Sequence, residues 1–369
     1  MKILFVMILV SFSAIANDGV YSFAKSDTCK ACHTQIFDEF FSSMHANSTP
    51  QKDMIHNAVW SKHPQNVKQN RYGCGKCHTP AADNLDKMMA KGQQAIPMQD
   101  NETHQAGISC AYCHRIKSIQ LHQKSNINVI SSAEKHYFGT RDSGVTSPYH
   151  EIIKTDNEHF KNGNLCIGCH SHKQNKSGLN VCTTEIQNTE GGPNCVSCHM
   201  PKVKGGVSQI STTKTHVFHG FSGAHNHSNL LQQYVDLSLY IHSNHFLVMV
   251  ENQASHAFLL HPLRVAVLKV RIVRGEKLMP QKNELFVRVI GKDGKPAMPW
   301  VANTTLKDSM LKAKEKRAVK YNVSLQKGDK VEVVLGYYLV NPKALKPLKL
   351  QNEKVATEFH LFKQQVFEF

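Results

Sequence analysis

Five copies of one short pattern stand out in this chain of 369 residues: two cysteines three positions apart, with a histidine directly after the second. In chain order, motifs 1 to 5 are Cys29/Cys32/His33, Cys74/Cys77/His78, Cys110/Cys113/His114, Cys166/Cys169/His170 and Cys195/Cys198/His199. This spacing attaches haem c, because both sulfurs bond to the porphyrin and the histidine ligates the iron. With 11 Cys and 23 His, a random chain of this length would hold about 0.02 such patterns. The motifs therefore predict five covalently attached haems, each with one iron.

Paired cysteines also occur in zinc ribbons and in the disulfide frameworks of exported proteins. A structural zinc ion takes four protein ligands and needs no histidine directly after the second cysteine, whereas haem attachment requires that histidine. Ten of the 11 cysteines fall into the pattern. We expect haem at all five motifs, and zinc or disulfides are the alternatives.

The first residues have the features of an export signal. A basic residue at position 2 precedes an apolar run over residues 3–14, and the small side chains of Ala14 and Ala16 are typical of a cleavage site. We predict a signal peptide over residues 1–16 and a mature protein that is periplasmic or secreted. An uncleaved anchor is the alternative, but the apolar run is shorter than the roughly 20 residues that span a bilayer. No later run is long and apolar enough for a transmembrane segment.

The formal net charge is +16 at pH 7, which is typical of proteins that bind nucleic acid or anionic membranes. Each haem brings two propionates, however, and five haems would neutralise most of this excess. The sequence has no basic module with interleaved aromatic residues, and export makes a nucleic-acid partner improbable. We expect other redox proteins as partners, a donor and an acceptor, and a modest positive surface that steers their docking.

Composition divides the chain into two parts. All five motifs lie between residues 29 and 199, a stretch with few aliphatic side chains to spare, so the haems must take the place of a core. Beyond residue 223, apolar and polar residues alternate in runs at 235–241, 245–250, 264–272, 284–290 and 329–334. Asp293-Gly294 and residues 327–329 supply turns. We predict a mainly α and irregular multihaem domain over residues 17–223, followed by an antiparallel β-sandwich domain over residues 224–369.

Histidines outside the motifs are candidates for the far sides of the irons. A helical pattern over residues 34–45 carries His45 about three turns away from motif 1, toward another iron. The polar connection over residues 117–160 is long for a structureless loop, and in it His150 follows a turn that Pro148 stiffens. A second helical pattern over residues 53–60 contains His56 and leads to His63, which fit a packing or surface role at least as well.

The residues around the motifs resemble a known family. Motif 1 followed by Ser43-Met44-His45 is similar to the opening of the tetrahaem cytochromes that accept electrons from hydroxylamine oxidoreductase. That family is related through its haem packing to pentahaem nitrite reductases and octahaem hydroxylamine oxidoreductases. Residues 198–201, 216–220 and 252–256, with Arg264, are similar to exported multihaem cytochromes that carry a C-terminal β domain.

The resemblance implies that histidines from distant segments close the far sides of the irons, and that one of them reaches back from the β domain. Carried over to this sequence, these outer ligands are His45, His150, His216 and His256. Around His256 the sequence departs from its relatives, since Ser255 replaces a glycine and residues 259–261 replace a Pro-Thr-Gly turn. Candidates for a fifth outer ligand are His63, His122 and His136.

Function depends on how many irons have two histidines. An iron with two axial histidines has no vacant position and serves electron transfer, whereas an iron without an outer ligand can bind small molecules. Relatives that reduce nitrite commonly carry a Cys-x-x-Cys-Lys motif, which this sequence lacks. We therefore expect an electron carrier rather than an enzyme. The alternative is an oxidoreductase of a small nitrogen or sulfur compound with one open haem.

Overall fold

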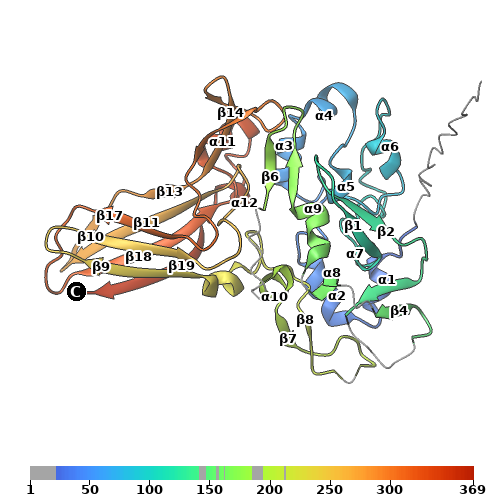
Figure 1. The fold of residues 1–369 in the computed structure, drawn as a ribbon, viewed down its shortest axis with the longest axis horizontal. Coiled ribbons are helices and arrows are strands. Elements are labelled where there is room, and N and C mark those ends of the chain that lie inside the picture. Colours follow the sequence, from blue (N-terminus) through green and yellow to red (C-terminus); the bar gives the residue numbers. More distant parts are fainter. Residues whose placement is uncertain (1–21, 141–146, 155–157, 162, 185–193, 212) are drawn as a thin grey trace, which may run out of the picture.

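The computed structural model describes residues 22–140, 147–154, 158–161, 163–184, 194–211 and 213–369. The predicted signal peptide lies outside these residues. Figure 1 shows two lobes, one of short helices and small sheets from the N-terminal part and one of long strands from the C-terminal part. Among the described residues, no helix has both the length and the apolar character needed to cross a membrane.

The N-terminal lobe combines short helices with two-stranded sheets. Its α-helices are α1 (Ser26–Lys30), α2 (Thr34–Phe41), α3 (Met54–Trp60), α4 (Pro64–Gln69), α5 (Gly75–His78), α6 (Leu85–Met89), α7 (Cys110–His114), α8 (Glu158–Lys161), α9 (Ile167–His170) and α10 (Cys195–His199). It also contains the 3-10 helix η1 (Asn164–Cys166), whereas a second 3-10 helix, η2 (Ser228–Tyr234), directly precedes the first strand of the C-terminal lobe and packs against that lobe. The strands pair as β1 (Ile116–Gln120) with β2 (Ile127–Ile130), β3 (His136–Gly139) with β4 (Glu151–Lys154), β5 (His172–Gln174) with β6 (Asn180–Thr183), and β7 (Lys202–Lys204) with β8 (Thr215–Val217). The pair β3–β4 is parallel and the other three pairs are antiparallel.

Sequence periodicity predicted the first helices of this lobe, and the structure confirms them as α2 and α3. In α2 the side chains of Phe37 and Phe40, three positions apart on one face, are buried. At the start of α3, Asp53 accepts hydrogen bonds from two backbone N–H groups, each at 3.0 Å, and so satisfies donors that a first helical turn leaves unpaired. The helix α2 is shorter than its pattern, so that His45 lies beyond its end.

The polar connection over residues 117–160 contains more secondary structure than we predicted, since β1 to β4 and α8 lie largely within it. Its start is anchored by apolar contacts: Ile116 is buried with Tyr112, and Ile119 and Ile130 pack against them. These apolar residues are too widely spaced to form a clear strand period. Residues 141–146 and 155–157 of the connection lie outside the described part of the chain.

The C-terminal lobe consists mainly of antiparallel strands. Its strands are β9 (Val235–Ile241), β10 (Phe246–Asn252), β11 (Val265–Arg274), β12 (Lys277–Pro280), β13 (Glu284–Phe286), β14 (Arg288–Lys292), β15 (Lys295–Pro296), β16 (Thr304–Asp308), β17 (Lys316–Tyr321), β18 (Lys330–Tyr338) and β19 (His360–Glu368). Two short helices, α11 (Pro342–Leu348) and α12 (Lys354–Thr357), precede β19. The sheets have the orders β17-β10-β9, β12-β11-β18-β19 with β13 beside β11, and β15-β14-β16.

Four of the five predicted runs are confirmed as the strands β9, β10, β11 and β18. The run over residues 284–290 is divided instead, because β13 pairs with β11 whereas β14 pairs with β15 and β16. Asp293 and Gly294 form the predicted turn after β14, with φ angles of 50° and 72°. A two-residue hairpin loop of type I′ requires positive φ at both positions.

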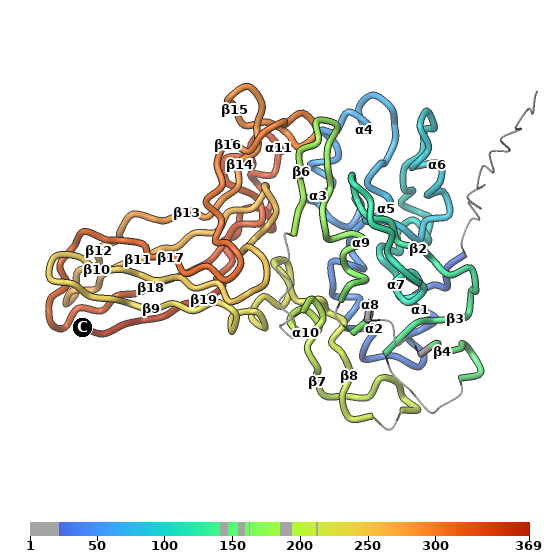
Figure 2. Tube along the Cα trace, in the orientation of Figure 1, coloured from blue at the N-terminus to red at the C-terminus, as the bar shows by residue number. Residues whose placement is uncertain are grey.

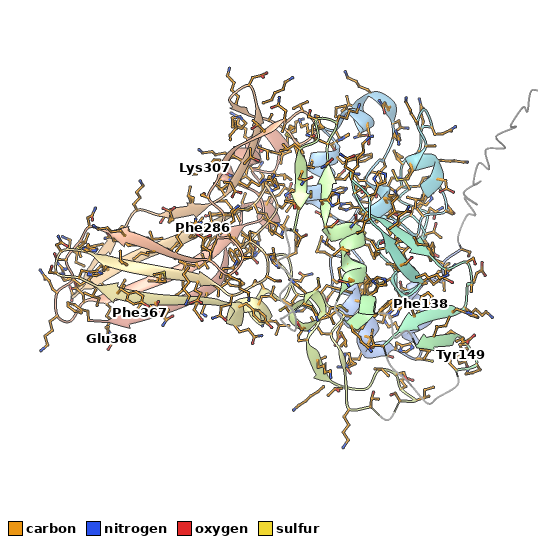
Figure 3. All side chains as sticks on the ribbon, viewed as in Figure 1. Phe138, Tyr149, Phe286, Lys307, Phe367 and Glu368 are labelled. Atoms are coloured by element: carbon orange, nitrogen blue, oxygen red, sulfur yellow. The ribbon has the colours of Figure 1, made fainter. Side chains whose placement is uncertain are left out.

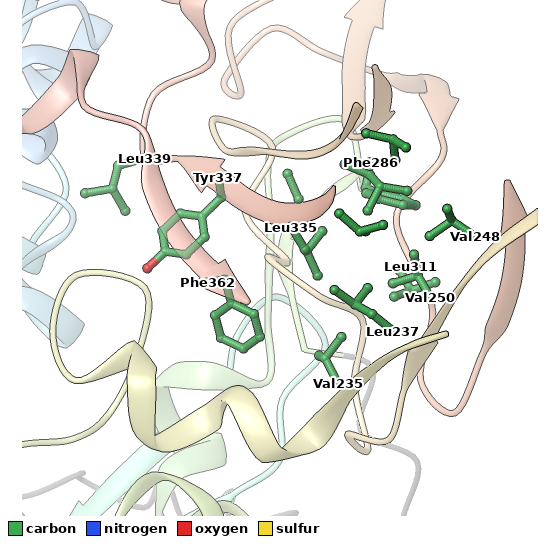
Figure 4. Close-up of a cluster of buried hydrophobic side chains, with 14 of the residues drawn as sticks. Val235, Leu237, Val248, Val250, Phe286, Leu311, Leu335, Tyr337, Leu339 and Phe362 are labelled. Carbon is green, nitrogen blue, oxygen red and sulfur yellow. The ribbon is translucent and has the colours of Figure 1, made fainter. Parts of the chain in front are cut away.

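One buried cluster fills the C-terminal lobe, and Figure 4 shows part of it. Leu237 of β9 and Val248 of β10 belong to it, together with Leu268 of β11 and Leu335 of β18. Two different sheets therefore turn apolar faces toward the same core. Burial of such side chains stabilises a fold by about 25 cal/mol per Å² of apolar surface, so this lobe has a side-chain core of its own.

The lobes are joined by packing and by hydrogen bonds. Ile55 of α3 belongs to the buried cluster of the C-terminal lobe, and Val181 of β6 packs with Ala302. The Asn175 side chain donates to the backbone oxygens of Pro299 at 2.7 Å and Ala302 at 2.6 Å. Accordingly, β6 and α3 lie beside β14 and α11 in Figures 1 and 2. The C-terminal lobe is docked against the N-terminal one, and the domain limits at residues 223 and 224 stay a prediction.

Candidate functional site

Each motif lies on or just after a short helix. The helices α5, α7, α9 and α10 end at the histidines of motifs 2 to 5, and α1 ends shortly before Cys32 of motif 1. Side chains three and four positions apart lie on one face of a helix. The spacing therefore presents two thiols and one imidazole to the same side, and all ten motif cysteines are half-buried.

Backbone carbonyls orient the motif histidines. In four of them Nδ1 lies within hydrogen-bond distance of a carbonyl oxygen: His33 to Val207 at 2.6 Å, His78 to Ser48 at 2.9 Å, His114 to Phe138 at 2.8 Å and His199 to Ser222 at 2.6 Å. A carbonyl only accepts, so Nδ1 carries the proton and donates. The lone pair of a neutral ring is then on Nε2, as in metal-ligating histidines whose other nitrogen is held by a second group.

Four motif histidines face a second imidazole at nearly the same separation. The distances between ring centres are 6.2 Å for His33–His150, 6.3 Å for His114–His219, 6.0 Å for His170–His45 and 5.9 Å for His199–His256. In each pair the second histidine comes from a segment outside the motif's own helix. The fold thus builds the same arrangement four times from different parts of the chain.

This separation fits an iron between two imidazoles. An imidazole nitrogen ligates a transition metal at about 2 Å, and the ring centre lies about 1.1 Å behind that nitrogen. Two rings on opposite sides of one ion therefore have their centres about 6 Å apart. Together with the proton on Nδ1 of His33, His114 and His199, this spacing fits the bis-histidine iron of a haem.

The outer histidines are also held in the neutral form that a metal ligand needs. Burial lowers the pKa of His45 to about 3, and the neighbouring His170 and His219 add to the effect. Burial likewise lowers the pKa of His219 to about 4, with His114 as the next cause. Both rings are uncharged at neutral pH.

Of the predicted outer ligands, the structure brings His45, His150 and His256 to motif histidines, but His216 occupies a different place. Its Nδ1 lies 3.1 Å from the backbone oxygen of Gly205, and its Nε2 lies 2.8 Å from a carboxylate oxygen of Glu39. His219 faces His114 instead. His216 lies within β8, whose pairing with β7 fixes the direction of its side chain, whereas His219 follows the strand. This strand end is the signal that could have separated the two histidines.

Motif 2 differs from the other four. The imidazole that contacts His78 is that of His56, with ring centres 4.0 Å apart and planes 11° from parallel. This spacing is too short for an ion between the rings, so His56 lies alongside His78. Nε2 of His56 is 2.7 Å from the hydroxyl of the buried Tyr72. His56 therefore acts as a packing neighbour of the motif histidine.

The three candidates for a fifth outer ligand have other contacts. Nδ1 of His63 accepts from the backbone N–H of Gln65, and its ring packs against Trp300. Nδ1 of His122 accepts from the backbone N–H of Lys124 at 3.3 Å. His136 pairs with Glu151 at 3.0 Å. Each has a local partner on its own segment or on the C-terminal lobe.

Contacts between thiols bring different motifs together. The thiol of Cys110 hydrogen-bonds to Cys29 and lowers the pKa of Cys29 to about 7. Equivalent contacts join motif 4 to motif 2 and to motif 5, through the pairs Cys169/Cys77 and Cys166/Cys195. Motif 4 therefore touches two others. The 11 cysteines form no disulfide, and the described residues contain no group of three or more His, Cys, Asp or Glu side chains arranged to hold a metal ion.

The second cysteine of motif 5, Cys198, contacts a residue that lies far from it in the sequence. Its sulfur lies 3.9 Å from the hydroxyl of Ser197, and the hydroxyl of Tyr234 hydrogen-bonds to it, which raises the pKa of Tyr234 to about 12. Cys198 thus contacts the end of η2, whereas its motif partner Cys195 contacts motif 4. The physical reason is that η2 brings Tyr234 to α10, which local spacing in the sequence does not predict. A sulfur bonded to a porphyrin keeps lone pairs that can accept from this hydroxyl, and haem attachment at Cys198 stays a prediction.

Comparisons with known proteins agree with this geometry. Residues 28–115 match the family described as cytochrome c554 and c-prime. The structure is similar to that of a penta-heme cytochrome c552 from Thermochromatium tepidum, with a TM-score of 0.73 and 19% identity, over 94% of this chain and 99% of that chain. A β-glucosidase 3B from Thermotoga neapolitana aligns with a TM-score of only 0.14 and 11% identity, over 36% of this chain and 16% of that chain, and carries no argument. A search of curated proteins found no match. The family match covers motifs 1 to 3, and the similar structure shows a shared fold over most of the chain.

The contact between motifs 4 and 5 depends on Gly163. Its φ is 72°, and a Cβ at this position would lie 2.6 Å from Cβ of Cys195. Gly178 has a similar φ of 77°, but a Cβ there would meet nothing within 4 Å. Substituting either glycine by alanine costs about 1–2 kcal/mol for positive φ, and Gly163→Ala costs about 1–3 kcal/mol more through overpacking.

We therefore expect Gly163→Ala to lower the midpoint of thermal unfolding more than Gly178→Ala does, as measured by far-ultraviolet circular dichroism. Gly178→Ala is the control for backbone strain alone. Equal midpoints in the two variants would contradict a close packing of motif 5 on motif 4.

Proposed function

We propose that this protein is an exported pentahaem c-type cytochrome that relays single electrons between redox partners. The observation that carries the proposal is the set of four imidazole pairs, whose ring centres are 5.9–6.3 Å apart. The cysteines of motifs 1 to 5 hold the haems covalently, and the motif histidines are the proximal ligands. His150, His219, His45 and His256 are the outer ligands at motifs 1, 3, 4 and 5.

Haem c, when bound, supplies an iron that takes up and releases one electron as it cycles between ferric and ferrous states. The residues of the chain keep the ligands in place during this cycle. Carbonyl oxygens fix the proton on Nδ1 of the motif histidines, and burial keeps the outer histidines neutral. A closed coordination sphere of this kind favours electron transfer over substrate binding.

The organisation of the chain supports the same function. We propose a haem-binding domain over residues 17–223 and an antiparallel β sandwich over residues 224–369, which supplies the outer ligand His256 and so acts as an integral wall. Contacts of motif 4 with motifs 2 and 5, and of motif 1 with motif 3, favour close neighbours among the haems. The formal net charge of +16, reduced by propionates, suits acidic redox partners in the periplasm.

The assignment of His219 as the outer ligand of motif 3 can be tested by mutation. We expect His219→Ala to leave one iron without its second imidazole, so that a high-spin ferric signal absent from the wild type appears in electron paramagnetic resonance. His216→Ala is the matched control from the same segment, and its spectrum should match that of the wild type because His216 contacts Glu39 and Gly205. An additional high-spin signal in His216→Ala, with none in His219→Ala, would overturn the assignment.

A second candidate function rests on motif 2, where His56 lies alongside His78. The half-buried His261 lies near His78, and removal of its ring from water lowers its pKa to about 3, with the positive charge of Arg264 as the next cause. An iron at His78 without an outer imidazole has room for a ligand, and the Arg264 charge favours an anion. A haem held at His78 would then provide the reaction site of an oxidoreductase for a small nitrogen or sulfur compound, and haems at the other four motifs would supply its electrons.

Nitrite and hydroxylamine are suitable probes for this second function. If the iron at His78 is open, adding either compound to the oxidised wild-type protein shifts the visible spectrum of one haem. The His219→Ala variant is the positive control, because its iron at motif 3 is opened by design. A shift in this variant without any shift in the wild type would exclude an accessible iron at motif 2.

A further inference from the structure

Residues 219–222 contact the histidines of two different motifs. His219 faces His114 of motif 3, with ring centres 6.3 Å apart. Three residues later, the backbone oxygen of Ser222 accepts a hydrogen bond from Nδ1 of His199 in motif 5 at 2.6 Å. The backbone N–H of Ser222 in turn donates to the oxygen of His199 at 3.0 Å. This short segment is therefore fixed at both ends by groups that belong to iron sites.

Between these two ends, Phe221 contacts a third iron site. Its ring lies edge-on to His45, with ring centres 4.0 Å apart and an angle of 62° between the planes. His45 is the histidine that faces His170 of motif 4. The same ring also lies edge-on to His219, at 6.1 Å and 81°. One aromatic side chain thus contacts the outer histidines of two different motifs, in the edge-to-face geometry that aromatic rings prefer.

The backbone of Phe221 is held in an unfavourable conformation for this contact. Its φ is 50°, in the left-handed region that a bulky side chain rarely adopts. Such strain persists only where the surroundings fix it, and it is often found at functional sites. Here the flanking residues provide that constraint, because Ser222 is bonded to His199, and the His219 backbone N–H donates to Glu39 at 2.9 Å.

We propose that Phe221 is a positioning residue that fixes the ring planes of His45 and His219, and so links the axial geometry at motifs 4 and 3. The proposal rests on the haem ligation described under the proposed function. Groups that pack against a metal ligand determine its orientation, and through it the properties of the metal. With the ring in place, neither imidazole can rotate without moving it. Removing the ring takes this contact away from both imidazoles at once, while Nδ1 of His219 keeps its hydrogen bond to the backbone oxygen of Val217 at 2.6 Å.

The test uses variants that separate the ring from the backbone. Phe221→Leu removes the ring and keeps a side chain that disfavours positive φ, whereas Phe221→Asn removes the ring and suits that conformation. Phe221→Tyr keeps the ring and should therefore retain the wild-type orientation of both imidazoles. Phe218→Leu is the matched control, because Phe218 lies in the same segment and its ring contacts His227.

We expect both ring-removing variants to shift the g values of two low-spin ferric signals in electron paramagnetic resonance, and the midpoint potentials of the same two haems. The other ferric signals of these two variants should match those of the wild type. The Phe221→Tyr and Phe218→Leu variants should have the wild-type spectrum throughout. Unchanged signals in both ring-removing variants would overturn the proposal, as would an equal shift in Phe218→Leu.

Two further outcomes are distinguishable. Loss of haem-loaded protein in both ring-removing variants, with normal Phe221→Tyr, would show a role in folding alone and would also overturn the proposal. Absence of low-spin signals in the wild type would instead contradict the ligation itself, before any variant of Phe221 is compared.

Discussion

Two imidazole rings held about 6 Å apart, a spacing that fits one metal ion between them, are the constraint on which the N-terminal lobe depends. The constraint occurs four times, and each time the two histidines come from different segments of the chain. Short helices, hairpins and turns suffice to hold them, because each motif histidine is also tied by Nδ1 to a carbonyl or packed among neighbouring motifs. Figure 3 labels two residues at one edge of this lobe: Phe138 of β3, whose backbone oxygen accepts from His114, and Tyr149, which precedes His150 and β4.

The two lobes obtain their stability in different ways. The C-terminal lobe has a continuous core of residues such as Leu268 and Val333, which are fully buried. In the described part of the N-terminal lobe, buried side chains form small clusters, for example Trp60 with Tyr72 and Met88. Its motif cysteines remain half-buried in the polypeptide. Covalently bound cofactors are the kind of group that completes such a lobe, as metals do in small domains.

Local patterns in the sequence predicted what is locally determined. The motifs, the helix at α3 and the long strands β9, β10, β11 and β18 all follow from spacing or alternation within a few residues. The division of residues 284–290 between two strands did not follow, because each half pairs with a different partner far away in the sequence. The small strands within residues 117–160 were missed for a similar reason. Their apolar residues show no local period, and they form a cluster only through contacts with Tyr112 and its neighbours.

Prediction of the candidate site from local sequence patterns has the same limit. Sequence resemblance could point to the segment around residue 216, but only the end of β8 distinguishes His219 from His216. The contact of Cys198 with Tyr234 likewise joins residues that no local pattern relates.

Electron paramagnetic resonance of the oxidised wild-type protein, with haem content counted by mass spectrometry, tests the central claim most directly. Four imidazole pairs predict low-spin ferric signals from four irons, and a single iron with different ligands at motif 2. High-spin ferric signals from two or more irons in a protein that carries five haems would contradict the account.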